Sequence, residues 1–219
     1  MQRETNTRTA FANRWRIATA LLAAFCAGCT SLKRFAYEGF GRDKWQKPDQ
    51  VIQSLQLRPG DRAADLGSGG GYFTFRLAKA VGPTGHVYAV DVDEGLNDYI
   101  AGRARDEGFD TVSVILAKYD DPLLPADGVD MIFTSDTYHH LEHRADYFRN
   151  ARKYLRLGGR VAIIEYAGRG WFDGWFGHWT PNATIREELE TADYQLKQEF
   201  TFLPRQFFLV FAPTPAAAR

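Results

Sequence analysis

A run of glycines behind an acidic residue is the stretch of this sequence best suited to chemistry. The stretch Asp65–Gly71 (DLGSGGG) follows a short segment, 61–64, that is expected to form a buried strand. Phe73, Leu77 and Val81 then recur at helical spacing, so the glycines are predicted at a strand-to-helix turn. Backbone without side chains admits a ligand closely, and a helix start offers unpaired N–H groups to it.

Two classes of cofactor use such a turn. Dinucleotide sites need a third glycine, in Gly-x-Gly-x-x-Gly, and counted from Gly67 that position is Tyr72. An acid followed by Gly67, Gly69 and Gly71 instead resembles motif I of the class I S-adenosylmethionine (SAM) methyltransferases, Asp/Glu-x-Gly-x-Gly-x-Gly. The resemblance implies that Asp65 holds the methionine end of SAM and that the three glycines let SAM approach the backbone. A merely flexible loop is the alternative, which the flanking strand and helix disfavour.

A second acid fits a nucleoside ligand. Residues 86–91 (HVYAVD) are predicted to form a strand that ends at Asp91, 20 residues after Gly71. A carboxylate there accepts hydrogen bonds from both hydroxyls of a ribose. Nicotinamide and SAM enzymes share this feature, so Asp91 predicts a nucleoside without identifying it.

The third predicted strand, 111–116, leads into another segment that resembles the family. Tyr119–Pro125 (YDDPLLP) is similar to the family's Gly-Asp-Ala-x-x-Leu-Pro, and the match implies that Asp120 binds the adenine amine. The alternative is an ordinary acidic loop.

Paired histidines follow the fourth predicted strand, 129–134. His139 and His140 resemble the His-His of methyltransferases that act on quinone precursors and similar small molecules. Since the carboxyl ends of the strands face the ligand in this fold, we expect His139 to orient a substrate or accept its proton. Alternatively, His140 packs against the sheet and His139 caps the next helix. No metal site is expected around them, despite His143, because cysteines and ligand spacing are lacking there.

An aromatic, glycine-rich stretch at 168–180 contains Trp171 and Trp175. It is too rich in glycine for a helix and too long for a tight turn. We interpret it as a lid over the pocket of a small-molecule acceptor, with a surface hairpin as the alternative.

The N-terminus has the pattern of a secretory signal. Four arginines among the first 16 residues precede an uncharged run, 17–32, that is shorter than a membrane-spanning helix. The run contains Ala27-Gly28-Cys29, which resembles the lipobox of bacterial lipoproteins, with Cys26 where leucine is usual. We therefore expect an exported, membrane-associated protein acylated at Cys29. A non-cleaved anchor or a start codon placed too early is the alternative, and the protein is cytoplasmic if this segment is no working signal.

These residues require an α/β scaffold to position them. The 219 residues divide into a signal or anchor segment (1–29), a linker (30–47), a methyltransferase domain (48–212) and a disordered tail (213–219). Equal numbers of basic and acidic residues, 27 each, argue against a nucleic-acid partner. The expected strands are 61–64, 86–91, 111–116, 129–134, 160–165, 194–202 and 206–211, and the expected helices 48–57, 72–81, 94–107, 142–155 and 181–192.

The resemblance implies a three-layer Rossmann-like methyltransferase fold, with a seven-stranded, mostly parallel sheet and an antiparallel final strand. The implied activity is methyl transfer from SAM to a small molecule. Two alternatives stay open: a membrane-tethered nucleoside-binding protein of the same fold without catalysis, and an NAD(P)-dependent oxidoreductase.

Overall fold

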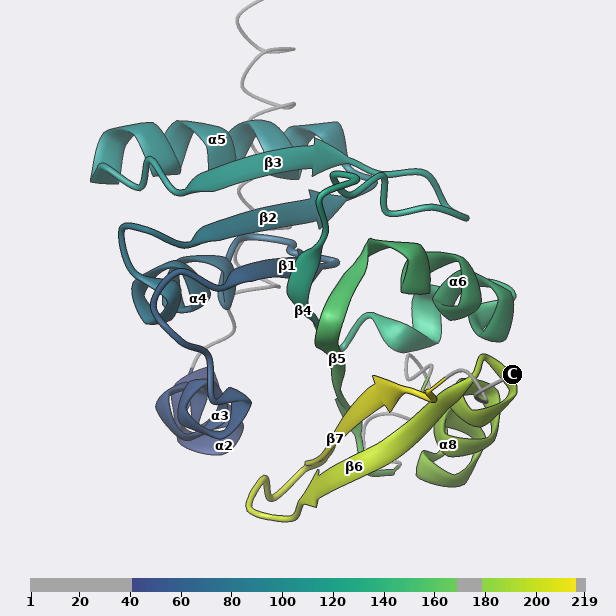
Figure 1. The fold of residues 1–219 in the computed structure, drawn as a ribbon. Coiled ribbons are helices and arrows are strands. Elements are labelled where there is room, and N and C mark those ends of the chain that lie inside the picture. Colours follow the sequence, from purple (N-terminus) through teal and green to yellow (C-terminus); the bar gives the residue numbers. More distant parts are fainter. Residues whose placement is uncertain (1–40, 169–178, 216–219) are drawn as a thin grey trace, which may run out of the picture. The chain divides into compact units, whose positions relative to one another are not determined.

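The computed structural model describes residues 41–168 and 179–215 (Figure 1). The elements that position the site are, in chain order, α2 (Arg42–Gln46), α3 (Pro48–Leu55), β1 (Arg62–Leu66), α4 (Thr74–Val81), β2 (His86–Asp91), α5 (Glu94–Glu107), β3 (Val112–Leu116), β4 (Val129–Ser135), the 3₁₀ turn η1 (Tyr138–His140), α6 (Arg144–Ala151), η2 (Arg152–Tyr154), β5 (Leu155–Tyr166), α8 (Asn182–Thr191), β6 (Tyr194–Phe200) and β7 (Gln206–Pro213).

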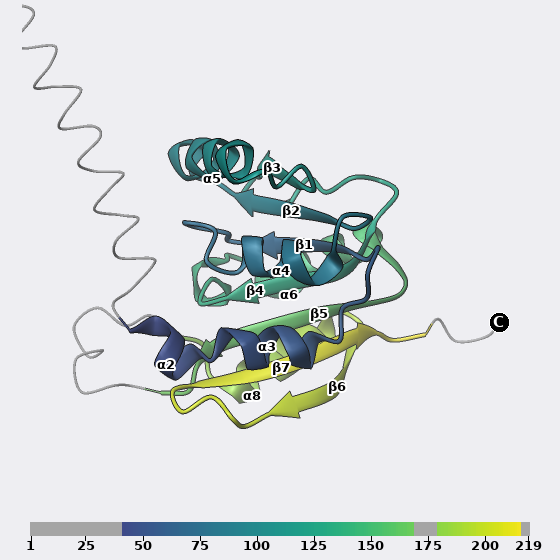
Figure 2. The same ribbon diagram turned by 90° about the vertical axis from the view of Figure 1, so that its left-hand side faces the viewer.

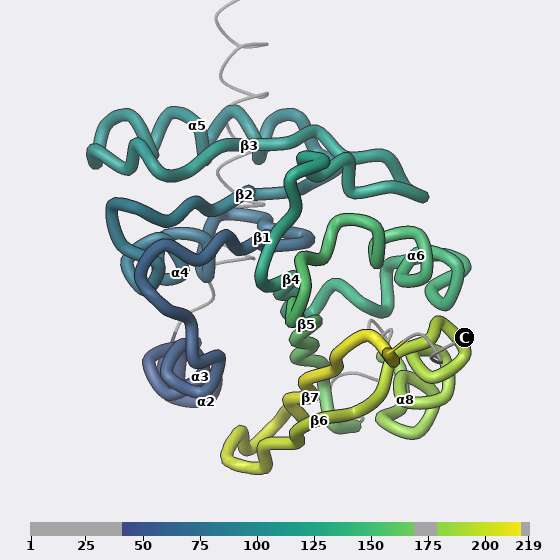
Figure 3. Tube along the Cα trace, in the orientation of Figure 1, coloured from purple at the N-terminus to yellow at the C-terminus, as the bar shows by residue number. Residues whose placement is uncertain are grey.

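One sheet of seven strands runs through the domain in the order β3-β2-β1-β4-β5-β7-β6. The strands from β3 to β5 are parallel, and β7 pairs antiparallel with both β5 and β6. Figure 3 shows β6 and β7 joined as a hairpin at the edge of the sheet. The predicted fold class, including the antiparallel final strand, is confirmed.

Helices cover both faces of the sheet, with α3, α4 and α5 on one face and α6 and α8 on the other (Figures 1 and 2). Parallel strands buried on both faces must be apolar along their length, as Met131, Ile132 and Phe133 of β4 are. Alternate residues of one strand enter opposite cores: Ile132 packs with Tyr138 and Ile185, and Phe133 packs with Phe73 and Leu77. The helical spacing of residues 73, 77 and 81 thus predicted a true core face.

The strand order reverses beside β1, because β2 and β3 extend the sheet on one side and β4 on the other. Open α/β sheets bind ligands outside the carboxyl ends of their strands at such a switch point. The segments that follow β1, β2 and β4 therefore surround one position, and they contain the predicted site residues.

The helix expected over 142–155 is shorter than predicted. It divides into α6 and η2, and β5 begins at Leu155, five residues before the strand expected over 160–165. Leu155 pairs with Val129, and the pairing resumes at Arg160 opposite Met131, so the glycines form a bulge within the strand. Gly158 has φ +81°, which glycine adopts at little cost.

The N-terminal segment with Cys29 and the aromatic segment with Trp171 and Trp175 lie outside the described residues. Among the residues that are described, no helix combines the length and the apolar character needed to cross a membrane.

Candidate active site

The glycine loop after β1 is folded as the motif requires. Gly67, Gly69 and Gly71 have φ values of +72°, +53° and +81°, which side-chain-bearing residues rarely adopt. The N–H groups of Gly67 and Ser68 both donate to the carbonyl of Val90 in β2. The loop is therefore attached to the neighbouring strand and has a fixed shape.

Two of the three glycines are also required by protein neighbours. A Cβ on Gly67 would lie 2.2 Å from Oγ1 of Thr137, and one on Gly71 would lie 2.7 Å from the ring of Phe75 in α4. Gly71 thus leaves room for the ring of Phe75. The prediction explained these glycines by approach of a ligand alone, and the structure adds a packing reason.

Asp91 lies at the end of β2, beside the glycine loop. Its Oδ2 accepts from the N–H of Gly69 at 2.9 Å, and its Oδ1 accepts from the N–H of Asp93 at 3.0 Å. Each carboxylate oxygen has a further lone pair for a ligand hydroxyl. Ribose binding by Asp91 stays a prediction, and its position beside the glycine loop suits it.

Asp65 is buried inside β1, with 3% of its surface exposed. Oγ1 of Thr74 donates to its Oδ2 at 2.6 Å. Burial raises the pKa of Asp65 to about 6, although Thr74 and the positive charge of Arg42 lower it. Binding of the methionine end of SAM by Asp65 stays a prediction.

The structure distinguishes the two adjacent acids after β3. Asp121 accepts hydrogen bonds from Lys153, Asn150, Tyr154 and the N–H of Leu123, which hold its pKa well below the usual range. Its neighbour Asp120 has an exposed side chain. Asp121 therefore anchors the loop, and Asp120 is the acid that a ligand can reach.

The residues of this region fit SAM. Oγ of Ser68 is buried in the glycine loop and has no hydrogen-bond partner in the described part of the chain. A buried hydroxyl without a partner is costly, and a bound polar ligand relieves that cost. Ser68, Asp91 and the glycine loop would hold the nucleoside and methionine parts of the cofactor.

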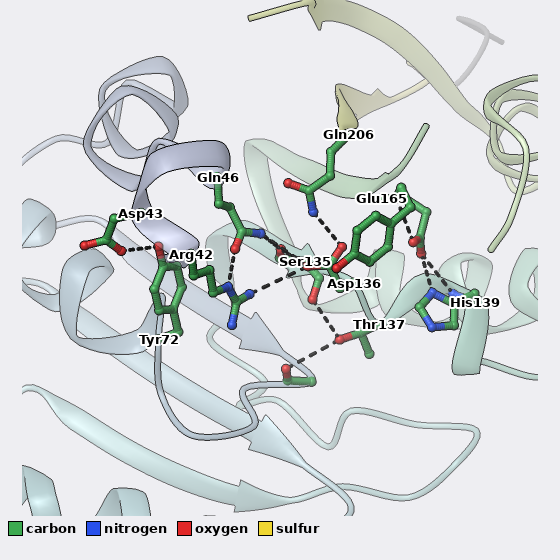
Figure 4. Close-up of polar contacts among 12 residues, drawn as sticks. Arg42, Asp43, Gln46, Tyr72, Ser135, Asp136, Thr137, His139, Glu165 and Gln206 are labelled. Atoms are coloured by element: carbon green, nitrogen blue, oxygen red, sulfur yellow. Dashed lines mark hydrogen bonds and ion pairs between the residues drawn. The ribbon is translucent and has the colours of Figure 1, made fainter. Parts of the chain in front are cut away.

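His139 forms a pair with Glu165, a buried acid in β5, the strand that pairs with β4. Its Nδ1 lies 2.8 Å from Oε2 of Glu165, which is fully buried, and its backbone N–H donates to the same oxygen at 3.3 Å (Figure 4). Helix α6 begins after His143, whose side chain forms no cap, so the alternative in which His139 caps the helix is wrong. His140, expected in that alternative to pack against the sheet, has an exposed side chain.

Asp136, which no motif of the sequence singles out, is the centre of a polar cluster at the end of β4. Its carboxylate accepts from Nε2 of Gln46 at 3.2 Å and from Nε2 of Gln206 at 2.6 Å, and it lies 3.6 Å from a guanidinium nitrogen of Arg42 (Figure 4). Its φ of +56° is uncommon for a residue with a side chain. Burial and the charge of Glu165 raise the pKa of Asp136 to about 6.

Helix α2 lies within the range expected to be a linker, and it contributes directly to the site. Arg42 lies over the ring of Tyr72, 3.9 Å from its centre, and contacts Asp136 on its other side. The hydroxyl of Tyr72 donates to Asp43 at 2.5 Å. Arg42 and Asp43 belong to no motif, so no pattern in the sequence pointed to them. Glu165 had a weak signal, as an acid at the end of an apolar strand.

The comparisons with known proteins agree with this geometry. A family model described as "Methyltransferase domain" matches residues 57–206. This match favours neither the nicotinamide-dependent oxidoreductase nor the nucleoside-binding protein without catalysis.

Two curated relatives share part of the sequence. They are the ubiquinone/menaquinone biosynthesis C-methyltransferases UbiE of Ectopseudomonas mendocina (28% identical over 121 residues, 55% of this chain) and Burkholderia mallei (28% over 117 residues, 53% of this chain). The chain spans about half the length of these relatives, 47% and 48%.

Solved structures share the fold. A SAM-dependent methyltransferase from Aquifex aeolicus superimposes with a TM-score of 0.72 at 23% identity, covering 82% of this chain and 96% of that one. The [4+2]-cyclase SpnF superimposes with a TM-score of 0.67 at 15% identity, covering 78% and 81%. Because a cyclase has the same fold, the fold alone does not decide the reaction.

Proposed function

The chain belongs to the methyltransferase domain family, and we propose that it transfers a methyl group to a small molecule whose acceptor group loses a proton to His139. S-adenosylmethionine is its cofactor. When bound, SAM supplies a methyl group on a positively charged sulfur, which leaves with the electron pair of the broken bond. The protein's task is to align the acceptor with that methyl group and to take the proton.

The pair of His139 and Glu165 is the observation that carries this proposal. An ionised carboxylate only accepts hydrogen bonds, so Glu165 places the proton of a neutral His139 on Nδ1. Nε2 is then the nitrogen that takes the proton of the acceptor. Glu165 stabilises the positive charge that develops on the ring, as the acid of a catalytic triad does for its histidine.

The chemical class of the acceptor follows from the same pair. A base is needed where the acceptor is an O–H or N–H group, or a ring carbon made nucleophilic when a neighbouring hydroxyl loses its proton. The relatives' name, C-methyltransferase of ubiquinone/menaquinone biosynthesis, supports a hydroxylated ring. We therefore propose a small hydroxylated or amino-bearing ring as the acceptor.

The predicted export of the protein is part of this proposal. Four arginines before an uncharged run, and Cys29 behind Ala27-Gly28, support a lipoprotein anchored outside the cytoplasm. Changing Cys29 to Ala should then release the protein from the membrane fraction or leave a larger precursor, and Cys26→Ala should do neither. Wild-type protein found only in the soluble cytoplasmic fraction would contradict export.

Transfer of a labelled methyl group tests the activity. Purified protein is incubated with SAM carrying a tritiated methyl group and with a small-molecule extract of cells, and organic-soluble label is counted. His139→Ala should remove most of the transfer. His140→Ala changes the same residue type one position away and should retain it. Equal transfer by both variants would contradict the role of His139, and no transfer by the wild type would contradict the activity.

A further inference from the structure

A polar side chain lies on the buried face of helix α5. The buried residues of that helix are Leu96, Asn97, Ile100 and Ala104, and the surface of Asn97 is only 5% exposed. Asn97, Ile100 and Ala104 recur at helical spacing, so Asn97 occupies a position where an aliphatic side chain would pack against the sheet. A buried amide needs hydrogen-bond partners, and those of Asn97 lie in the sheet.

The amide nitrogen of Asn97 joins the ends of two strands. Its Nδ2 donates to the carbonyl of Asp91, the last residue of β2, at 3.1 Å and to the carbonyl of Ile115 in β3 at 3.4 Å. Helix α5 packs against both of these strands (Figure 1). The two hydrogen bonds therefore attach the helix to both strands at the end of the sheet where Asp91 lies.

The amide oxygen of Asn97 is unsatisfied. Oδ1 is buried without a hydrogen-bond partner in the part of the chain that the structure describes. The orientation of the amide is fixed, because a flipped amide would place Oδ1 against two carbonyl oxygens. A buried acceptor without a partner lowers stability by about as much as two intramolecular hydrogen bonds raise it. Stability alone therefore does not explain why an amide occupies this position.

The contact with Asn97 belongs to a set of hydrogen bonds that hold Asp91. The same carbonyl of Asp91 accepts from the N–H of Ala117, which directly follows β3, at 2.9 Å. The two carboxylate oxygens accept from the N–H groups of Gly69 and Asp93. Among these contacts, that of Asn97 is made by a side chain, so a substitution can remove it without altering the other donors.

We propose that Asn97 is a positioning residue for the cofactor: its amide ties the main chain of Asp91 to α5 and β3, and this directs the carboxylate of Asp91 at the ribose hydroxyls. Hydrogen bonds weaken steeply when their geometry departs from linear, so a small rotation of Asp91 would lose ribose contacts. This role concerns the cofactor and goes beyond the proposed methyl acceptor. It rests on the predicted binding of the ribose by Asp91, not on His139.

Two matched cofactor analogues measure how well the carboxylate is placed. S-adenosylhomocysteine and its analogue without the ribose 2′-hydroxyl differ by one hydrogen-bond donor. Their binding to the full-length protein is measured by calorimetry. We expect the wild type to bind the ribose compound about tenfold or more tightly, as for one hydrogen bond to a charged group. Asp91→Ala should remove most of that preference.

Asn97→Leu separates positioning from stability. Leucine has the same branching as asparagine, and it removes both donated bonds together with the unsatisfied oxygen. The melting temperature should therefore stay within about 3 °C of the wild type or rise. The preference for the ribose compound should fall to about threefold or less, because the main chain of Asp91 is no longer held by the helix. If Asn97→Leu does not fold, Asn97→Ala takes its place and should show the same loss of preference.

Ala104→Gly is the matched control on the same face of α5, two turns further along the helix. Glycine weakens a helix interior, so this change should lower the melting temperature by about 2–4 °C. It does not touch Asp91, and the preference for the ribose compound should stay at the wild-type ratio. Stability and preference should thus change independently in the two variants.

A reduced preference in the Asn97 variant, with the wild-type preference in Ala104→Gly, supports the positioning role. An unchanged preference in the Asn97 variant, or an equal loss in Ala104→Gly, would overturn it, because Asn97 would then only support the fold. A wild type that binds neither compound or does not distinguish them would also overturn it, as would an unchanged preference in Asp91→Ala. None of these measurements involves methyl transfer, so failure of the proposed function is seen separately, in the assay with labelled SAM.

Discussion

The two halves of the site, on either side of β4, are built in different ways. The cofactor half is made of backbone and short-range contacts, such as the bond from the N–H of Gly69 to Asp91, 22 residues away. The half that we propose for the acceptor is made of side chains from α2, β4, η1, β5 and β7 that meet at Asp136 and Glu165. On the proposed function, the first half holds the cofactor and the second holds the acceptor, so the two halves should respond differently to substitution.

Changing His139 to Ala gives the largest expected effect. Loss of a general base lowers turnover about 10²–10⁴-fold. The affinity for SAM, measured by calorimetry, should change less than twofold, because His139 lies in the acceptor half. A fall in SAM affinity with His139→Ala would mean that the two halves are not separable.

Removal of Trp171 and Trp175 should mainly raise the KM for the acceptor, as the lid hypothesis requires.

Gly67→Ala should act on stability. The new Cβ would lie 2.2 Å from Oγ1 of Thr137 on a backbone with φ +72°, so we expect a loss of about 3 kcal/mol in the free energy of unfolding. A second change, Thr137→Gly, removes the clash and should restore part of that loss. Urea unfolding of the single and double variants measures both. Absence of any rescue would show that the backbone conformation alone requires glycine.

Asp91→Ala tests the side-chain contribution to the cofactor half. Each hydrogen bond to a charged group contributes about 1.5–3 kcal/mol, so loss of the bonds to the ribose should weaken SAM binding tenfold or more. Gly69→Val should remove SAM binding, because the valine side chain would fill space in the loop that the cofactor needs. Calorimetry that finds unchanged affinity in both variants would exclude this loop as the cofactor site.

Asp136→Asn tests the raised pKa of Asp136 through the pH dependence of stability. Because burial raises the pKa of Asp136 from 3.8 to about 6, the folded protein binds this proton more tightly than the unfolded chain. The stabilisation is therefore complete below about pH 4 and lost as the pH rises to about 6. Relative to wild type, Asp136→Asn should gain about 2 kcal/mol over that range. Urea unfolding at several pH values measures the difference, and a difference independent of pH would contradict the raised pKa.

The smallest effect is expected for the adenine position. Asp120→Ala should weaken SAM binding by about threefold to tenfold, as expected for one exposed hydrogen bond, without lowering the melting temperature. Asp121→Ala should do the opposite, because Asp121 holds Lys153, Asn150 and Tyr154 together. Reversed results would assign the adenine contact to Asp121.

The same difference explains what the sequence could predict. The positions of the strands and of the glycine loop follow from local patterns, such as the acid before Gly67 and the apolar run of β4, whereas the fold class came from the family resemblance. Gln46, Asp136 and Gln206 are unremarkable in the sequence, and their proximity arises only when α2 and β7 pack at the end of β4. His139 was identified from a resemblance, and its partner Glu165 only from the folded strand.

The hydrogen bonds that meet at Asp136 also bear on the order in which the protein folds. Gln46 and Gln206 reach Asp136 from 90 and 70 residues away along the chain. Closing loops of that length costs about 1 kcal/mol more than closing the 22-residue loop between Gly69 and Asp91. The contact from Gln206 to Asp136 therefore forms only when the hairpin of β6 and β7 docks onto β5. We expect nascent chains that end before β7 to contain the glycine loop and Asp91 but to lack Gln206, one of the side chains that hold the carboxylate of Asp136.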